Sequence, residues 1–207
     1  MKTWLRSGFV SLGLALAFPL STAHAGARDP MGETASYKVD KNKDRTSSLI
    51  KDGTMETVVM EASQGDSGKT YKVDINYEIN LIIGGKQKGT SSVQIPESYF
   101  TDTFWNDLRA NGSYVTDKFK VKYLSANVTV STQQGQTFEN CDQVLVYDIP
   151  TKKQAIAPFP LQGGGLEDLE IVMYHHPSLP VLGAARMDAR GTYLKQKIKM
   201  GADYTAD

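Results

Sequence analysis

The clearest feature of the sequence is a strict alternation of apolar and polar residues in one thirteen-residue stretch. Every odd position of this stretch is apolar, and all but one of the even positions are polar. The apolar members are Tyr71, Val73, Ile75, Tyr77, Ile79, Leu81 and Ile83. Because successive side chains of a β-strand point to opposite faces, this spacing predicts a long strand with one buried and one solvated face.

Shorter alternating segments follow, and turn-forming residues separate them. The glycines of residues 84–89 predict a reversal into a second strand over residues 90–95. Alternation over residues 119–130 and 144–149 predicts another hairpin. We expect a final hairpin to turn at residues 188–191.

One segment has helical spacing instead. Phe100, Phe104 and Leu108 recur every four residues, and Pro96 and Gly112 suit the start and the end of a helix. The alternating strands argue against a parallel α/β fold, because buried parallel strands are apolar on both faces. The sequence therefore predicts a mainly β protein, an antiparallel β-sandwich or open barrel of about seven to nine strands with one short amphipathic helix.

The first 25 residues have the three parts of a secretory signal peptide. Lys2 and Arg6 precede an uncharged, largely apolar stretch over residues 8–20, and Ala23 and Ala25 are small residues at the cleavage positions. The apolar stretch is too short to span a bilayer, so we expect no transmembrane anchor in the mature chain. The mature protein is expected to be exported, to a periplasm or to the extracellular space.

Composition divides the rest of the chain into two predicted regions. Residues 26–53 are polar and charge-rich, which predicts a loosely ordered leader. Residues 54–207 are expected to form a single β-rich domain. The 207-residue chain is formally neutral, and the part after the signal carries a charge of −2, which disfavours nucleic-acid binding.

Two short segments have lysine at alternate positions. Lysines stand at 118, 120 and 122 and again at 195, 197 and 199. If the two strands were neighbours, the six ammonium groups would form a patch that attracts an anionic lipid, a glycan or an acidic partner. Alternatively, the lysines protect exposed strands from pairing with other molecules.

Candidate binding residues are concentrated in the last third of the chain. Residues 150–165 contain three prolines and three consecutive glycines, which is typical of a long functional loop. The two histidines of the mature chain are adjacent, so on a strand they cannot readily bind one metal ion together. The candidate ligand-binding residues are Phe159, Leu161, Glu167, Asp168, His175, His176, Lys195 and Lys197.

Three motifs suggest chemistry, but each is incomplete. Residues 65–68 resemble the nucleophile segment of chymotrypsin-like serine proteases, yet Lys69 replaces the next glycine and no mature histidine precedes the serine. Residues 40–44 have the oxygen spacing of a calcium loop, but Arg45 stands where the loop needs glycine. Cys141 is the single cysteine, so we expect a buried core residue and no internal disulfide. We therefore predict no cofactor and no metal site.

The sequence favours a non-enzymatic protein, because no assembled catalytic set is visible. We expect an exported soluble β-domain that acts as a binding or structural module of the cell envelope or extracellular space. An envelope protein, a glycan or a lipid is the expected partner. Two alternatives remain open: a hydrolase that uses carboxylates such as Glu167, Asp168 or Asp188, and a carrier of a lipid or small ligand with an apolar cavity.

Overall fold

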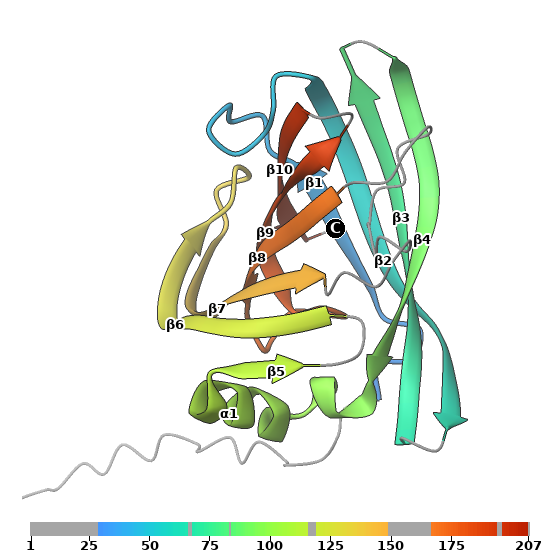
Figure 1. Cartoon of the computed structure of the whole chain (residues 1–207), viewed down its shortest axis with the longest axis vertical. Helices are drawn as coiled ribbons and strands as arrows, with labels where there is room; N and C mark the ends of the chain where they lie inside the picture. Colours follow the sequence, from blue (N-terminus) through green and yellow to red (C-terminus); the bar gives the residue numbers. More distant parts are fainter. Residues whose placement is uncertain are drawn as a thin grey trace, which may run out of the picture.

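The computed structural model describes residues 29–65, 68–82, 84–115, 119–148, 167–193 and 196–206. These residues form one open antiparallel sheet with the strand order β4-β3-β2-β1-β10-β9-β8-β7-β6-β5 (Figure 1). The elements are β1 (Thr34–Val39), β2 (Ile50–Gly65), β3 (Gly68–Leu81), β4 (Gly85–Pro96), the 3₁₀ helix η1 (Glu97–Phe100), α1 (Asp102–Asn111), β5 (Ser113–Val115), β6 (Phe119–Ser131), β7 (Thr137–Asp148), β8 (Glu167–His175), β9 (Ala184–Tyr193) and β10 (Gln196–Thr205). The predicted mainly β fold with one helix is confirmed, and its sheet has ten strands.

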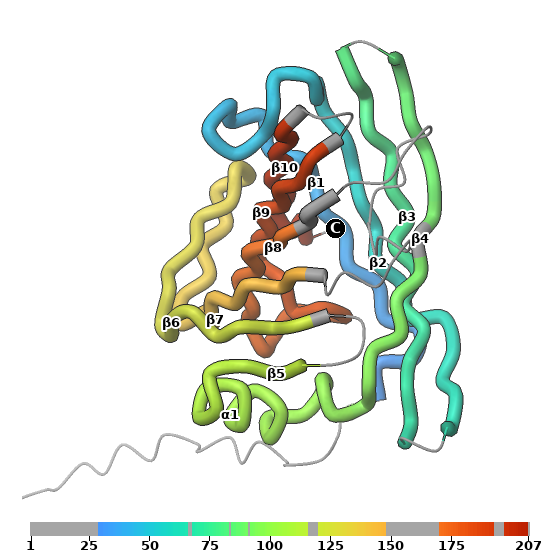
Figure 2. The backbone as a smooth tube through the Cα atoms, in the orientation of Figure 1, coloured from blue at the N-terminus to red at the C-terminus, as the bar shows by residue number. Residues whose placement is uncertain are grey.

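The sheet bends strongly across its width. Strands β2, β3 and β4 run upright at the right of Figure 1, whereas β5, β6 and β7 run across the view at the left. The backbone tube shows the same change of direction (Figure 2). One face carries buried residues from both halves of the sheet in a single hydrophobic cluster. We call this the inner face and the opposite side the outer face.

Strand β3 has the predicted alternation. The side chains of Tyr71, Val73, Ile75, Tyr77 and Ile79 are all buried on the inner face. The even-numbered side chains between them are only half-buried. Strand β3 pairs with β4 over twelve residues without a register shift, which confirms the predicted hairpin.

The segment predicted to be a loosely ordered leader contains a strand in the middle of the sheet. Strand β1 lies between β2 and β10, and Ala35, Tyr37 and Val39 are buried. The prediction failed because only three apolar residues mark β1, within a polar and charged context. Pairing on both sides supplies the stability that the local composition does not indicate.

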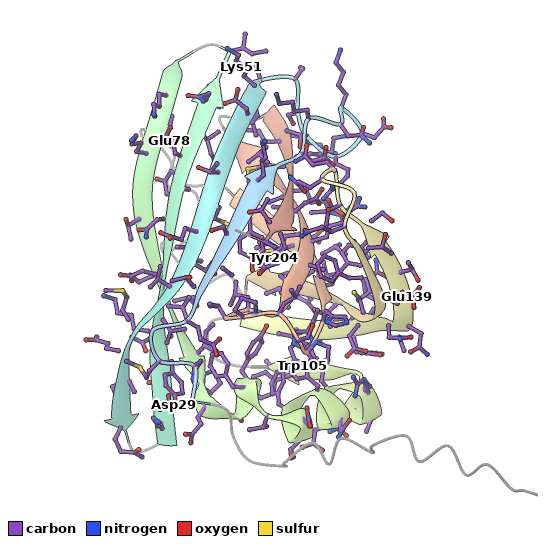
Figure 3. All side chains as sticks on the ribbon, turned by 180° about the vertical axis from the view of Figure 1, so that it is seen from behind. Asp29, Lys51, Glu78, Trp105, Glu139 and Tyr204 are labelled. Carbon is purple, nitrogen blue, oxygen red and sulfur yellow. The ribbon has the colours of Figure 1, made fainter. Side chains whose placement is uncertain are left out.

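The helix begins later than predicted. Pro96 ends β4 and precedes η1, and the side chain of Thr101 accepts a hydrogen bond from the backbone N–H of Phe104, so Thr101 is the N-cap of α1. Gly112 ends the helix in the left-handed conformation, as expected. Together η1 and α1 connect β4 with β5, the two edges of the open sheet. Figure 3 shows Trp105 of α1 at the opposite end of the molecule from Lys51.

The hairpin of β6 and β7 forms a second, smaller hydrophobic cluster. Several register shifts interrupt its pairing, and Asn127 and Asn140 have positive φ angles. Val130 and Cys141 of the hairpin pack with buried Ala185 of β9. The bulged backbone therefore bends the hairpin onto the sheet.

The last hairpin also differs from the prediction. Residues 188–191 do not turn but continue β9, and Asp188 pairs with Gly201 of β10. The glycine at 191 lies opposite Ile198 within the ladder. A strand glycine was thus mistaken for a turn glycine.

Candidate functional site

Among the residues that the structure describes, the predicted ligand-binding candidates do not gather in one place. Phe159, Leu161 and Lys195 lie outside the described residues, as does the predicted loop over residues 150–165. Glu167 and Asp168 are the first two residues of β8. The remaining candidates are His175 and His176 at the other end of β8, and Lys197 on β10.

The two histidines occupy different environments. His175 is buried, and its ring stacks on Trp105 with the ring centroids 3.5 Å apart and the planes at 11°. His176 is half-buried, and its Nδ1 lies 2.7 Å from the hydroxyl oxygen of Ser178. His175 therefore contributes to the core beneath α1.

The two lysine-rich segments lie on strands that are not neighbours. Lys120 and Lys122 belong to β6, Lys197 and Lys199 belong to β10, and β7, β8 and β9 lie between them. The condition for a single lysine patch on adjacent strands is not met. All four residues nevertheless lie on the outer face, because they alternate with inner-face residues such as Val121 and Met200.

Register pairs connect these lysines across the outer face. One transverse row crosses five strands from β10 to β6 and consists of Lys199, Arg190, Glu170, Tyr147 and Lys120. The next row on the same face consists of Gly201, Asp188, Val172, Leu145 and Lys122. We define the basic outer face as the surface formed by Lys120, Lys122, Leu145, Tyr147, Glu170, Val172, Arg190, Lys197 and Lys199.

Most of the cations on the basic outer face are exposed. Lys122, Arg190, Lys197 and Lys199 are exposed, and Lys120 is half-buried. The ammonium group of Lys120 lies 5.9 Å from the centre of the Tyr147 ring, within the range of a cation–π contact.

Few carboxylates oppose these cations. Glu170 accepts a hydrogen bond from Nε of Arg190, and Lys199 donates to the main-chain oxygen of Asp44 at 2.9 Å. Glu167 lies on β8 at the register position opposite Thr192. Among the described side chains, the five cations of the basic outer face exceed the carboxylates of Glu170 and of Asp188 in the adjacent row, and Asp188 already pairs with Arg45 and Arg186.

A largely buried arginine side chain, that of Arg45, lies at one end of the basic outer face. Arg45 lies in the loop after β1 and forms ion pairs with Asp40, with Asp188 at 2.6 Å and with Asp203 at 2.9 Å. A Cβ atom on Gly201 would lie 3.0 Å from the Arg45 side chain, so the glycine leaves the space that the arginine fills. Burial opposes the charged form of Arg45, but hydrogen bonds to Asp203 and Asp188 outweigh it and raise its pKa.

The Arg45 contacts join four parts of the chain. Asp203 is fully buried on β10 and also accepts a hydrogen bond from the backbone N–H of Gln133 in the β6–β7 turn. Asp188 also forms an ion pair with Arg186, whose guanidinium lies 5.5 Å from the centre of the Tyr174 ring. The loop, the turn, β9 and β10 are thereby fixed to one another. Sequence reasoning missed this cluster, since its members are distant in the chain.

The surroundings of Asp188 do not suit a general acid or base. Its Oδ1 accepts from Nε of Arg45 and its Oδ2 accepts from Nε of Arg186. Both oxygens are thus occupied by hydrogen bonds from guanidinium groups, so neither is free to exchange a proton with a substrate. The carboxylate alternative therefore finds no support at this residue.

The remaining candidate chemistry gives three observations. Burial and nearby Asp142 raise the pKa of the Cys141 thiol to about 11, which keeps it protonated and poorly nucleophilic.

Within the described ranges, three or more potential ligand side chains do not gather as a metal site would require. None of the helices in the described part of the chain is long and apolar enough to span a membrane.

Comparison with known proteins gives one distant likeness. Neither a family model nor a curated protein matches the sequence. Among solved structures, the chain is similar to a protein from Bacteroides fragilis that is described as exported and as having a YmcC-like fold. The two share 14% identity with a TM-score of 0.38, over 84% of this chain and 94% of the other. At these values the likeness assigns no function.

Proposed function

We propose that this protein is an exported, non-enzymatic binding domain that recognises an anionic partner through its basic outer face. The proposal is carried by the transverse row from Lys199 to Lys120, which aligns cations of three strands on one exposed surface. Export is inferred from the signal-like residues 1–25. The described chain offers no comparably assembled catalytic group.

The charge distribution supports an anionic partner. A chain whose mature part carries a net charge of −2 does not attract polyanions as a whole. Local attraction instead requires cations that are concentrated on one surface, as they are on the basic outer face. Exposed lysines keep their mobility and hydration until a partner arrives, and they act over about 8–10 Å at moderate ionic strength.

The inner face favours a surface-binding protein over a carrier that holds a lipid or small ligand in an apolar cavity. Its buried residues from β1, β2, β3, β6, β7, β8, β9, β10 and α1 form one continuous cluster. Large side chains such as Tyr37 and Tyr71 are almost fully buried within it. The described inner-face side chains therefore contact one another in the core, and the exposed outer face is the surface that we propose for recognition.

Charge-neutralising variants test the proposal. We expect the mature protein to bind immobilised dextran sulfate at low ionic strength and to be released by salt. The double variants Lys120→Gln/Lys122→Gln and Lys197→Gln/Lys199→Gln should each weaken binding by about tenfold, which corresponds to about 1.4 kcal/mol. The matched control, Lys86→Gln/Lys88→Gln, changes two exposed lysines of β4 that already pair with Glu78.

The control should bind like the wild type. Equal losses in all three variants would mean that overall charge, and not the basic outer face, determines binding. Failure of the wild-type protein to bind any polyanion would also reject the proposal. Urea unfolding of each variant verifies that the fold is unchanged.

A further inference from the structure

The basic outer face separates its lysines into two groups. Lys197 and Lys199 form one group on β10, extended by Arg190 on β9, and Lys120 and Lys122 form the other on β6. Four steps between neighbouring strands separate β10 from β6. At about 4.8 Å per step, the two groups lie roughly 19 Å apart along the row.

The middle of the row has a different character. Tyr147, Leu145 and Val172 are half-buried there, and Glu170 is bound by Arg190. A ligand that contacts both groups of lysines therefore crosses a middle section where the described residues offer no unpaired cation. The carboxylate of Glu170 repels a negative charge at this point but accepts hydrogen bonds from hydroxyl groups.

These features exclude several anions from contacting the whole row. A single phosphate or a mononucleotide is too short to reach both groups. A nucleic-acid strand carries a charge on every nucleotide and would place phosphates against Glu170. A better match has acidic groups at intervals, with neutral, hydroxyl-rich units between them.

Resting on the proposed function, we propose that the ligand is a linear acidic polysaccharide that lies across the strands, along the row from Lys199 to Lys120. Its carboxylates pair with the two groups of lysines. Its neutral sugars contact Tyr147 and donate hydroxyl hydrogen bonds to Glu170. The length of a sugar unit in an extended polysaccharide is close to the distance between neighbouring strands, so about one unit lies over each strand.

Oligosaccharides of increasing length test this geometry. Fragments of deacylated gellan of four, eight and twelve sugars carry one carboxylate on every fourth sugar, so carboxylates over β10 and β6 leave neutral sugars over Glu170 on β8, and calorimetry measures their affinities. We expect weak binding of the shortest fragments and a rise of about tenfold or more once a fragment reaches both groups, because the second contact is then intramolecular. In Lys120→Gln/Lys122→Gln the rise should disappear, while the affinity for the shortest fragments stays within twofold of wild type.

The possible failures can be told apart. If the wild type binds dextran sulfate but its affinity for the gellan fragments rises only gradually with length, this inference is wrong and the proposed function stands. If vesicles of phosphatidylglycerol bind with the same lysine dependence and no oligosaccharide binds, the partner is a lipid surface and the polysaccharide is rejected. If no polyanion binds at all, both proposals fail.

Discussion

Replacement of Arg45 by methionine should strongly destabilise the protein. The side chain of Arg45 is 10% exposed and pairs with three carboxylates, of which Asp203 is completely buried. Methionine fills similar space but leaves these carboxylates without the cation that compensates their burial. Removing one partner of a buried ion pair typically costs about 3–5 kcal/mol, and we expect a loss of this size in the free energy of unfolding.

A second substitution tests the physical reason for the loss. If the cost arises from an uncompensated buried charge, neutralising Asp203 should recover part of it. In the double variant Arg45→Met/Asp203→Asn, the introduced amide retains an oxygen for the backbone N–H of Gln133. We expect this double variant to be more stable than Arg45→Met alone by about 1 kcal/mol or more, since the two residues are in contact.

Urea unfolding followed by circular dichroism measures both effects. Arg190→Met is the matched control, because Arg190 lies on the same outer face but has a side chain that is 64% exposed and pairs with partly exposed Glu170. Exposed ion pairs contribute at most about 1 kcal/mol, so the control should lose no more than this. A loss for Arg45→Met as small as that for the control would refute the reasoning.

Three further predictions concern individual side chains. Gly183→Ala should cost about 2 kcal/mol or more in urea unfolding, since Gly183 has a φ of +65° and a Cβ would lie 2.4 Å from the ring of His175; an unchanged midpoint would contradict this. Cys141 should react with Ellman's reagent only after unfolding, and fast reaction of the native thiol would disprove the assignment. Because the pKa of this thiol is raised in the folded state, the free energy of unfolding should fall between about pH 9, where the unfolded thiol ionises, and about pH 11, where the folded thiol ionises. Thr101→Ala should cost about 1 kcal/mol because Phe104 loses its cap, whereas Thr101→Ser should cost little; equal losses would argue against capping.

The strand pattern was predictable wherever one face is buried and the other solvated. Tyr71 to Ile79 illustrate this, because the spacing of their apolar residues reflects the inner face directly. Strand β1 was not predictable, since only Ala35, Tyr37 and Val39 mark it and its partners are distant in sequence. The local sequence pattern thus predicted which side chains are buried, but it did not predict which strands pair with one another.

The candidate site shows the same limit. The alternation of lysines correctly placed them on solvated strand faces, but it contained no information about the strands that lie between β6 and β10. In the sequence, Arg45 was only the residue that interrupts a calcium-loop pattern. In the structure, its ion pairs link the loop after β1 with β9 and β10, and Asp203 extends the link to the β6–β7 turn. Its partners Asp188 and Asp203 are more than 140 residues away, and no spacing rule connects such positions.

The pairing of β1 with β10 affects how the protein assembles. The first and last strands of the described chain lie side by side in the middle of the sheet. Strands β2 to β4 and β5 to β9 each follow the chain order, so each group can form by local contacts. The two groups become one sheet only when β10 has been synthesised and joins them. A nascent or translocating chain therefore carries two separate halves, and shortening it by its last strand should prevent completion of the fold.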